Sequence, residues 1–239
     1  MSVADVEGIT GRRAVVTGAT GGIGRAVVDA LTAAGADVHG WDLDGAAVRA
    51  VDVSDRAAVA MAWKAVENDE GPIDLVVSAA GVLSEDWDIC MAVNAGGVRN
   101  ILDVAVQSMT DRRRGSAVVI SSNAGATPRA RMAPYAASKA AATSYARSIG
   151  LAVAGHGVRV NIVSPGSTDT PMLRGMWTSD DDRDAVLAGD PAQHRLGIPL
   201  QRIAAPTDIA AAVVYLASDA ARHVTMHDLR IDGGATLDM

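Results

Sequence analysis

The sequence predicts an α/β fold in which a doubly wound parallel sheet carries helices on both faces. Short runs of β-branched and other apolar residues alternate along the chain with alanine-rich helical stretches. Each run is apolar nearly throughout, as is typical of strands buried on both faces of a parallel sheet. Hydrophobic residues make up 49% of the 239 residues, which is enough for a core on each side. Right-handed crossovers between successive strands then give the doubly wound arrangement, in one domain over residues 1–239.

Strands are expected where a short apolar run ends near a Gly, Ser or Asp. The first run, RAVVTG, joins valines to a turn glycine, and the later runs follow a similar pattern. The expected strands, in order, are Arg12–Gly18, Ala36–Trp41, Arg49–Val53, Ile73–Gly81, Ser116–Ser122, Val158–Gly166 and Asp228–Gly234.

Helices are expected in the alanine-rich stretches that separate these runs. The expected helices are Gly22–Ala34, Asp55–Asn68, much of Asp86–Met109, about Tyr135–Ala154, and a stretch after Pro206. The segment Ser167–Leu200 is instead rich in Gly, Pro and Asp, so it is expected to be irregular. An irregular segment of that length in a compact domain is usually a lid or a binding segment.

The composition argues against several classes of partner. The chain carries 21 basic and 28 acidic residues, a net charge of −7, so it has no long-range attraction for nucleic acid or an anionic membrane. Its one cysteine, Cys90, excludes an intrachain disulfide and is expected to be a small buried side chain. No leader is seen and no apolar run approaches about 18 residues, so a cytoplasmic protein is expected.

A glycine-rich loop, VTGATGGIG, joins the first expected strand to the first helix. Gly18 permits a sharp turn, Gly22 lets the backbone approach a ligand, and Gly24 permits close helix–strand packing. The helix N-terminus then offers N–H groups and a positive dipole end to a pyrophosphate.

An acid follows this loop at the end of the second expected strand. Asp42 lies 18 residues beyond Gly24, where a carboxylate can accept hydrogen bonds from both ribose hydroxyls of NAD and would repel the 2′-phosphate of NADP. Asp52 and Val53 are expected to meet the adenine edge, and Asp55 is expected to cap the next helix. The expected cofactor is therefore NAD.

A tyrosine and a lysine stand one helical turn apart in APYAASKAA. Tyr135 and Lys139, at positions i and i+4, share one helix face, and a nearby ammonium lowers the pKa of a phenol. Tyr135 is thus the candidate general base. Ser122 could donate a hydrogen bond to the reacting oxygen, and Asn94 could anchor a water that relays protons to Lys139, or could be a buried structural amide.

These motifs occur in the order found in the short-chain dehydrogenase/reductase family, and the chain resembles that family from Arg12 to Ala235. The motifs are TGATGGIG, SAAG, Asn94, Ser122, YAASK and VNIVSPG. Ser78 departs from the asparagine that is usual in the family. The resemblance implies a Rossmann-type fold, a catalytic set of Asn94, Ser122, Tyr135 and Lys139, no metal, and a homotetramer. It also implies that the cofactor is bound by Gly18, Thr20, Gly22, Ile23, Gly24, Asp42, Asp52, Val53, Ala80, Gly81, Tyr135, Lys139, Pro165, Gly166, Thr168 and Thr170.

Other segments narrow the resemblance within the family. SPGSTDTPM, WTSDD, TPRARM and LGIPLQRIAAPTDIA resemble the members that oxidise 2,3-dihydro-2,3-dihydroxybenzoate in siderophore biosynthesis. The substrate would then be a cyclic dihydroaromatic carboxylate, and Ser122, Arg129, Met132 and Tyr135 would contact it. Arg129 would bind its carboxylate, with Arg131 and Arg174 as alternatives.

One departure leaves a second substrate open. Only 12 residues, Val82–Val93, separate Gly81 from Asn94, fewer than in the siderophore enzymes. This shorter wall could admit trans-2,3-dihydro-3-hydroxyanthranilate, which carries an amine at C2. A non-catalytic NAD-binding sensor is a third possibility, although all four polar catalytic positions are filled.

Overall fold

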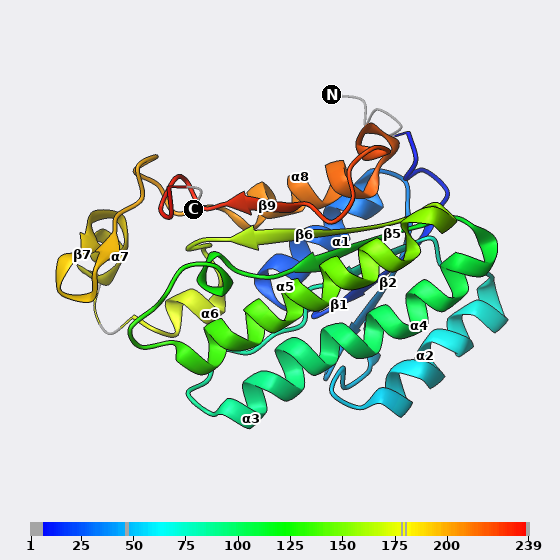
Figure 1. Ribbon diagram of the computed structural model, residues 1–239, viewed down its shortest axis with the longest axis horizontal. Helices are drawn as coiled ribbons and strands as arrows, with labels where there is room; N and C mark the ends of the chain where they lie inside the picture. The colour runs from blue at the N-terminus through cyan, green and yellow to red at the C-terminus, as the bar shows by residue number, and fades with distance from the viewer. Residues whose placement is uncertain (1–6, 46–47, 178, 180, 238–239) are drawn as a thin grey trace.

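A computed structural model describes residues 7–45, 48–177, 179 and 181–237. Its centre is a seven-stranded parallel sheet in the order β3-β2-β1-β4-β5-β6-β9 (Figure 1). The strands are β1 (Arg13–Thr17), β2 (Asp37–Asp42), β3 (Arg49–Ala50), β4 (Leu75–Ser78), β5 (Gly115–Ile120), β6 (Val158–Pro165) and β9 (Asp228–Ile231). The chain order reverses between β1 and β4, and in such sheets ligands bind beyond the carboxyl ends of the strands at this point. The predicted fold is confirmed.

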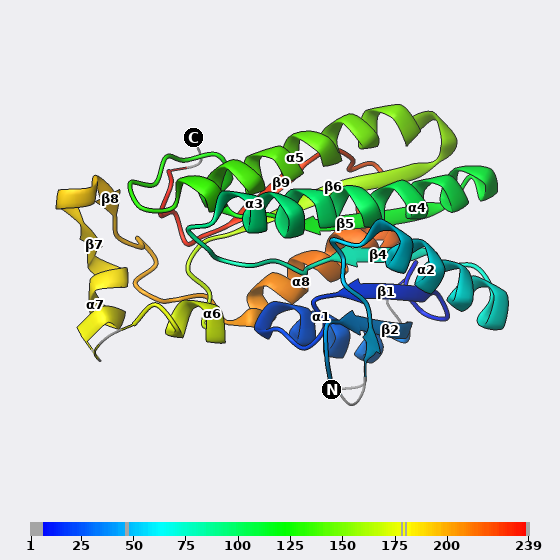
Figure 2. The ribbon, with the colours of Figure 1, turned by 90° about the horizontal axis from the view of Figure 1, so that it is seen from below.

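Helices cover both faces of the sheet, as Figure 2 shows. On one face, α1 (Gly22–Ala33) and α8 (Pro206–Ala217) contribute Val27, Leu31 and Leu216 to a buried apolar cluster. The helices of the other face are α2 (Arg56–Glu70), α4 (Gly97–Arg112) and α5 (Ala133–Val153). Two separate cores explain why the strands are apolar on both sides.

The long helix predicted over much of Asp86–Met109 is continuous but not uniform. It consists of α3 (Trp87–Cys90), a π-helical turn (Met91–Gly96) and α4. Trp87–Arg112 is also long and apolar enough, by length and composition alone, to span a membrane, which the sequence analysis did not anticipate. Half of its most apolar window is buried, because α4 packs on the sheet beside α2 and α5.

The third strand is much shorter than predicted. β3 ends at Ala50, because the Asp52 carboxylate accepts hydrogen bonds from Ser54 N at 2.8 Å and Ser54 Oγ at 2.7 Å, which forms a turn. Asp55 caps α2 as predicted, since its side chain accepts hydrogen bonds from Ala57 N and Ala58 N.

The segment predicted to be an irregular lid contains small elements of its own. They are α6 (Pro171–Arg174), α7 (Asp181–Ala188) and an antiparallel pair, β7 (Gly189–Asp190) with β8 (Arg195–Leu196). The segment leaves and rejoins the body at neighbouring points, because Thr168 and Ala204 form an isolated bridge. Asp169 N donates to Ala204 O at 2.9 Å, and Ala204 N donates to Ser167 O at 3.1 Å. We call residues 167–204 the lid.

Candidate functional site

The glycine loop lies at the carboxyl end of β1, where only glycine fits at two positions. Gly18 has φ +68°, and a Cβ there would lie 2.6 Å from Ala80 N. A Cβ on Gly24 would lie 1.9 Å from Gly18 O. The N-cap of α1 is Gly21, and no side chain caps it. The loop therefore presents an uncapped helix N-terminus, which suits the pyrophosphate of a dinucleotide.

Asp42 reaches this loop from the end of β2. Its Oδ2 accepts hydrogen bonds from Thr20 N at 2.9 Å and Thr20 Oγ1 at 2.7 Å, while Oδ1 accepts one from Leu43 N at 2.8 Å. The residue is partly exposed, and Oδ1, which accepts one hydrogen bond, can accept another. The acid and the glycine loop thus form one surface, and this arrangement fits a ribose beside the pyrophosphate.

The turn after β3 is held by a residue that the sequence analysis missed. Val53 is buried, and its carbonyl accepts a hydrogen bond from Asn100 Nδ2 at 2.9 Å. Asp52 is exposed, and its Oδ1 is occupied by Ser54. Asn100 lies in α4 and could not be recognised from the residues around it, because its partner Val53 is distant in the sequence.

A second missed residue, Thr17, fixes the chain where β4 ends. Its buried Oγ1 accepts hydrogen bonds from Ala79 N at 3.2 Å and Ala80 N at 3.3 Å. Gly81 follows, and a Cβ there would lie 3.1 Å from Asn94 Oδ1 and 3.2 Å from Lys139 Nζ. The backbone at Ala80 and Gly81 therefore passes between the glycine loop and the predicted catalytic residues.

Ser122, Tyr135 and Lys139 meet at the carboxyl end of β5. Ser122 follows the strand and Tyr135 lies in the first turn of α5, and the Ser122 side chain lies near enough to lower the pKa of the phenol. Lys139 is buried; its Nζ lies 5.8 Å from the centroid of the Tyr135 ring and donates to Ile120 O at 3.0 Å. The structure therefore brings together the three side chains that the sequence singled out.

The expected pKa shift of Tyr135 is wrong in this structure. Burial raises the pKa of the phenol, and the hydrogen bond from Ser122 lowers it by less. Lys139 is itself affected by burial, which lowers the pKa of its ammonium to about 8, although Cys90 raises it slightly. Removal from water is the largest cause for both groups, because each charged form loses its hydration.

Asn94 makes the contacts expected of a buried structural amide, and its role in a proton relay stays a prediction. Its buried amide donates to Val82 O and to Ser138 Oγ, both at 2.9 Å, and its Oδ1 accepts from Val82 N at 2.8 Å. Ser138 Oγ donates in turn to Tyr135 O at 2.7 Å. Both amide hydrogens are thus used within the protein, so the side chain has no donor left for a relay water. Asn94 sits in the π-helical turn, a feature often found at functional sites.

The remaining predicted cofactor residues follow β6 and lead into the lid. Thr168 is buried, and Thr170 caps α6 through a hydrogen bond from Leu173 N at 3.3 Å. A Cβ on Gly22 would lie 2.7 Å from Thr170 Cγ2, so Thr170 covers the glycine loop. Pro165 and Gly166 connect β6 to this segment, and Ile23 belongs to the first turn of α1.

The structure separates the three candidate arginines. Arg174 forms a bidentate ion pair with Asp169 at 2.6 and 2.8 Å, and Arg131 is exposed. Arg129 is half-buried, and burial lowers the pKa of its guanidinium. Met132, the N-cap of α5, is also half-buried. Arg129 is thus the best placed of the three to meet a buried anion.

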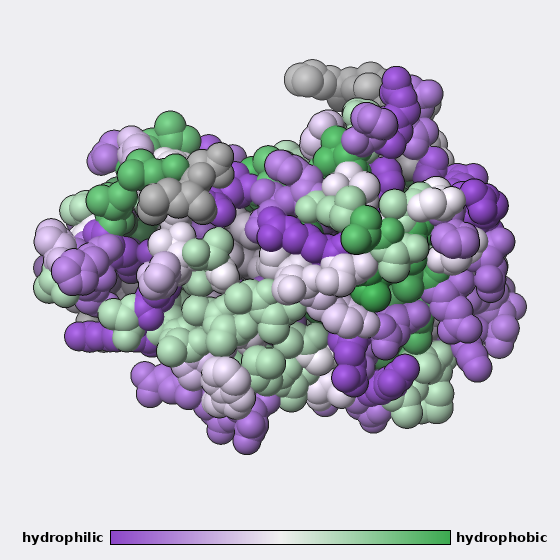
Figure 3. All heavy atoms as spheres, in the orientation of Figure 1, coloured by the Kyte–Doolittle hydropathy of each residue, from purple (hydrophilic) through white to green (hydrophobic). Residues whose placement is uncertain are grey.

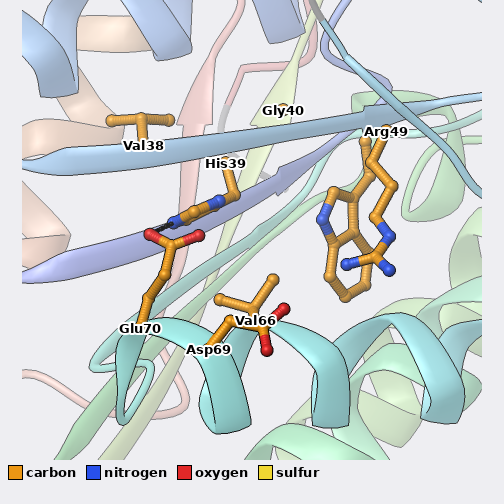
Figure 4. A pocket seen from close by; sticks show the side chains of 8 residues that line it. Val38, His39, Gly40, Arg49, Val66, Asp69 and Glu70 are labelled. Atoms are coloured by element: carbon orange, nitrogen blue, oxygen red, sulfur yellow. Dashed lines mark ion pairs between the residues drawn. The ribbon is translucent and has the colours of Figure 1, made fainter.

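A separate hollow lies between β2 and α2, lined by residues that include His39, Trp41 and Glu70, and Asp37 is close to it (Figure 4). Here Asp37, His39 and Glu70 could offer metal ligands, with His39 Nε2 3.2 Å from Glu70 Oε2. Arg13 Nε already lies 3.1 Å from Asp37 Oδ2 and 3.8 Å from Glu70 Oε2. The cluster therefore links β1, β2 and α2 as a charge network remote from the glycine loop.

Comparisons with known proteins agree with this arrangement. A family model described as Enoyl-(Acyl carrier protein) reductase matches residues 18–236. The 2,3-dihydro-2,3-dihydroxybenzoate dehydrogenase of Bacillus subtilis (strain 168) is 40% identical over 258 residues, covering 98% of this chain and 99% of that protein. The protein of the same name from Escherichia coli (strain K12) is 42% identical over 243 residues, covering 95% and 98%.

A solved structure extends the likeness to the fold. The crystal structure of gox2181 matches with a TM-score of 0.89 and 30% identity, covering 99% of this chain and all of that one. The sequence matches run from the glycine loop past β9, and the relatives align over almost their full length. The chain therefore belongs to the short-chain dehydrogenase/reductase family of oxidoreductases.

Proposed function

We propose that this enzyme oxidises 2,3-dihydro-2,3-dihydroxybenzoate to 2,3-dihydroxybenzoate with NAD⁺. The observation that carries the proposal is the grouping of Ser122, Tyr135 and buried Lys139, with Lys139 Nζ 5.8 Å from the centroid of the Tyr135 ring, at the same sheet edge as the glycine loop. The names of the two bacterial relatives support the choice of substrate.

The proposed cofactor site uses residues that fit each part of a dinucleotide. The N-terminus of α1 would hold the pyrophosphate, Asp42 the adenosine ribose, and the turn at Val53 the adenine edge. Lys139, Thr168 and Thr170 would lie toward the nicotinamide end. When bound, the nicotinamide supplies a hydride acceptor.

The chain's own side chains would manage the proton. The Ser122 hydroxyl donates a hydrogen bond to the oxygen at C3 of the substrate and orients it toward Tyr135. The Tyr135 phenolate takes the C3 hydroxyl proton as the C3 hydrogen leaves with its electron pair. Until the substrate oxygen takes that hydrogen bond, the Ser122 hydroxyl is the contact that lowers the pKa of Tyr135. The resulting ketone tautomerises to the aromatic catechol, which draws the reaction forward.

The preference for NAD⁺ follows from charge. Asp42 is partly exposed, and its nearest donors are Thr20 and the backbone N–H of Leu43, with no cation among its hydrogen-bond partners. A 2′-phosphate placed there would meet an uncompensated carboxylate.

A substrate panel tests the proposal. The wild-type enzyme with NAD⁺ is offered the 2,3-dihydroxy acid, its 2-amino analogue and a 3-hydroxyacyl thioester at equal concentration, and NADH is followed by absorbance. The dihydroxy acid should give the highest kcat/KM. The 2-amino analogue is the second candidate because the Val82–Val93 connection is short. If this compound gives the highest kcat/KM, only the assignment of the C2 substituent is overturned.

Tyr135→Phe is the matched variant for the same panel. It should bind NAD⁺ as the wild type does and lose roughly 10²- to 10⁴-fold in kcat, the usual contribution of a general base. Highest activity on the thioester would overturn the substrate class. Wild-type turnover by the Phe variant would overturn the role of Tyr135, and absence of turnover with every substrate beside normal NAD⁺ binding would favour a cofactor-binding sensor.

A further inference from the structure

Two arginines from distant parts of the chain lie near enough for their charges to act on each other. Arg129 lies between the short 3-10 helix Asn123–Gly125 and α5, and Arg195 lies in β8 of the lid. Figures 1 and 2 both place the connection before α5 next to the β7–β8 pair. Arg195 was not among the predicted site residues, because nothing in its local sequence indicates this neighbour.

Hydrogen bonds hold the lid on the Ser122 side of the molecule. Leu200 N donates to Gly233 O at 3.2 Å, which ties the segment after β8 to the residues after β9. In that second segment, Asp232 Oδ2 accepts from Asn123 Nδ2 at 3.2 Å. Asn123 is the neighbour of Ser122, so this chain of contacts places the residues after β8 on the same side of the molecule as Ser122.

The two guanidiniums have no anion in contact. Both residues are half-buried, and among the residues that the structure describes neither has a hydrogen bond or an ion pair within 4.0 Å. Burial lowers the pKa of Arg129, the positive charge of Arg195 lowers it further, and Asp232 raises it. Two half-buried cations without a contacting anion are unfavourable until an anion binds between them.

The nearby acids are already satisfied by other groups. Asp232 accepts hydrogen bonds from Asn123, Gly234 N and Thr236. Asp190, the acid opposite Arg195 in the β7–β8 pair, accepts from Ala192 N at 3.0 Å and from Gln193. No ion pair within 4.0 Å joins either carboxylate to an arginine among the described residues, so both carboxylates are engaged elsewhere.

We propose that Arg195 is a substrate-specificity residue that binds the substrate carboxylate together with Arg129. A carboxylate has two oxygens, and planar guanidiniums approaching from two segments can each engage it. Because Arg195 belongs to the lid, binding the carboxylate would also connect the lid to the substrate. A substrate with a carboxylate would therefore hold the lid closed, and a neutral ring would not. The identity of the acid rests on the proposed function; the presence of an anion site does not.

The test compares an acid with a neutral ring. Arg195→Gln and Arg195→Lys are assayed with 2,3-dihydro-2,3-dihydroxybenzoate and with the same dihydrodiol lacking the carboxylate. Binding of 2,3-dihydroxybenzoate and of benzoate is measured by calorimetry. Arg183→Gln, at an exposed position in the same lid, serves as the control. Arg195→Gln should raise KM for the acid and Kd for both aromatic acids roughly 10- to 100-fold, as expected for a lost charge-assisted hydrogen bond. Arg195→Lys should recover part of the loss.

The outcomes separate the two proposals. Arg195→Gln should leave kcat/KM for the neutral ring within about twofold of the wild type. Equal losses on both rings, or unchanged Kd for benzoate and 2,3-dihydroxybenzoate, would overturn the role of Arg195. Failure of the wild type to oxidise the acid would overturn the proposed function, and the binding measurements would still decide whether the arginine pair holds a carboxylate.

Discussion

At the scale of single residues, Tyr135 and Lys139 lie where little water reaches them. For each group the pKa moves in the direction that disfavours its charged form, upward for the phenol and downward to about 8 for the ammonium. The carbonyl of Ile120 is the one hydrogen-bond acceptor for Lys139 Nζ among the described residues. A buried charge with so few partners is a cost in stability that function can justify.

This cost should depend on pH. The pKa of Lys139 falls from 10.5 in the unfolded chain to about 8 in the fold, so between these values the unfolded chain binds more protons. The free energy of unfolding of the wild type should therefore rise with pH over this range, relative to that of Lys139→Met. At pH 7 the Met variant should be at least as stable as the wild type. Urea unfolding of both proteins at pH 7 and pH 10 measures this, and a stability difference that stays constant would contradict it.

Asp42 allows a second prediction at this scale. Asp42→Ala removes the carboxylate that would repel a 2′-phosphate, so the preference for NAD⁺ over NADP⁺ should narrow by roughly tenfold or more, in line with a lost charge interaction. Steady-state kcat/KM with each cofactor gives the ratio. Asp44→Ala, two residues further along and exposed, is the control and should keep the wild-type ratio. A wild-type preference for NADP⁺ would show that Asp42 does not have this role.

At the scale of elements, the lid differs from the body in how little it buries. α7 has no buried residue, and β7 and β8 are two residues each. Segments with few buried contacts open at low free-energy cost.

Hydrogen exchange rates should therefore differ between the lid and the body. Amides of α7 should exchange rapidly without ligands and become protected with NAD⁺ and 2,3-dihydroxybenzoate, while amides of β5 should be protected in both states. Strong protection of α7 in both states would remove the gating role of the lid.

The contrast between a buried body and an exposed lid explains how much of the structure could be predicted from the sequence. β1, β4, β5 and β6 were predicted because strands buried on both faces read as continuous apolar runs. α7 could not be predicted, since a helix without a buried face has no apolar stripe. Within the site, the i, i+4 spacing of Tyr135 and Lys139 and the spacing of the loop glycines could be recognised in the sequence itself. Thr17, Asn100 and Arg195 have no such spacing, because their contacts exist only once the chain is folded.

At the scale of the whole molecule, a chain of net charge −7 brings two arginines, Arg129 and Arg195, near enough for the charge of one to lower the pKa of the other. Such a local cation pair in an acidic protein selects small anions without attracting polyanions. The outer surface of α5 has a different character. Figure 3 shows a weakly apolar area over its alanine-rich stretch, where small side chains would let another helix approach closely.

The tetramer expected from the family is testable on this surface. The wild type should have four times the monomer mass by light scattering, and Ser144→Arg, on the exposed side of α5, should shift it toward smaller species. Ala57→Arg, on the exposed side of α2, adds the same bulk and charge elsewhere and should leave the mass unchanged. A monomeric wild type would contradict the expectation, and a tetrameric Ser144→Arg variant would move the interface away from α5.

The bridge between Thr168 and Ala204 joins the two ends of the lid, so the lid is a loop that leaves and re-enters the body at one point. A segment with joined ends can be exchanged without altering the strands that it leaves behind, because loop length costs little free energy once the ends are fixed. Tyr135, the proposed proton acceptor, and the glycine loop belong to the body, whereas Arg195 belongs to the lid. New substrate preferences could then arise by replacing the lid alone. Chimaeric enzymes that carry residues 169–203 on the body of a related enzyme are a direct way to obtain them.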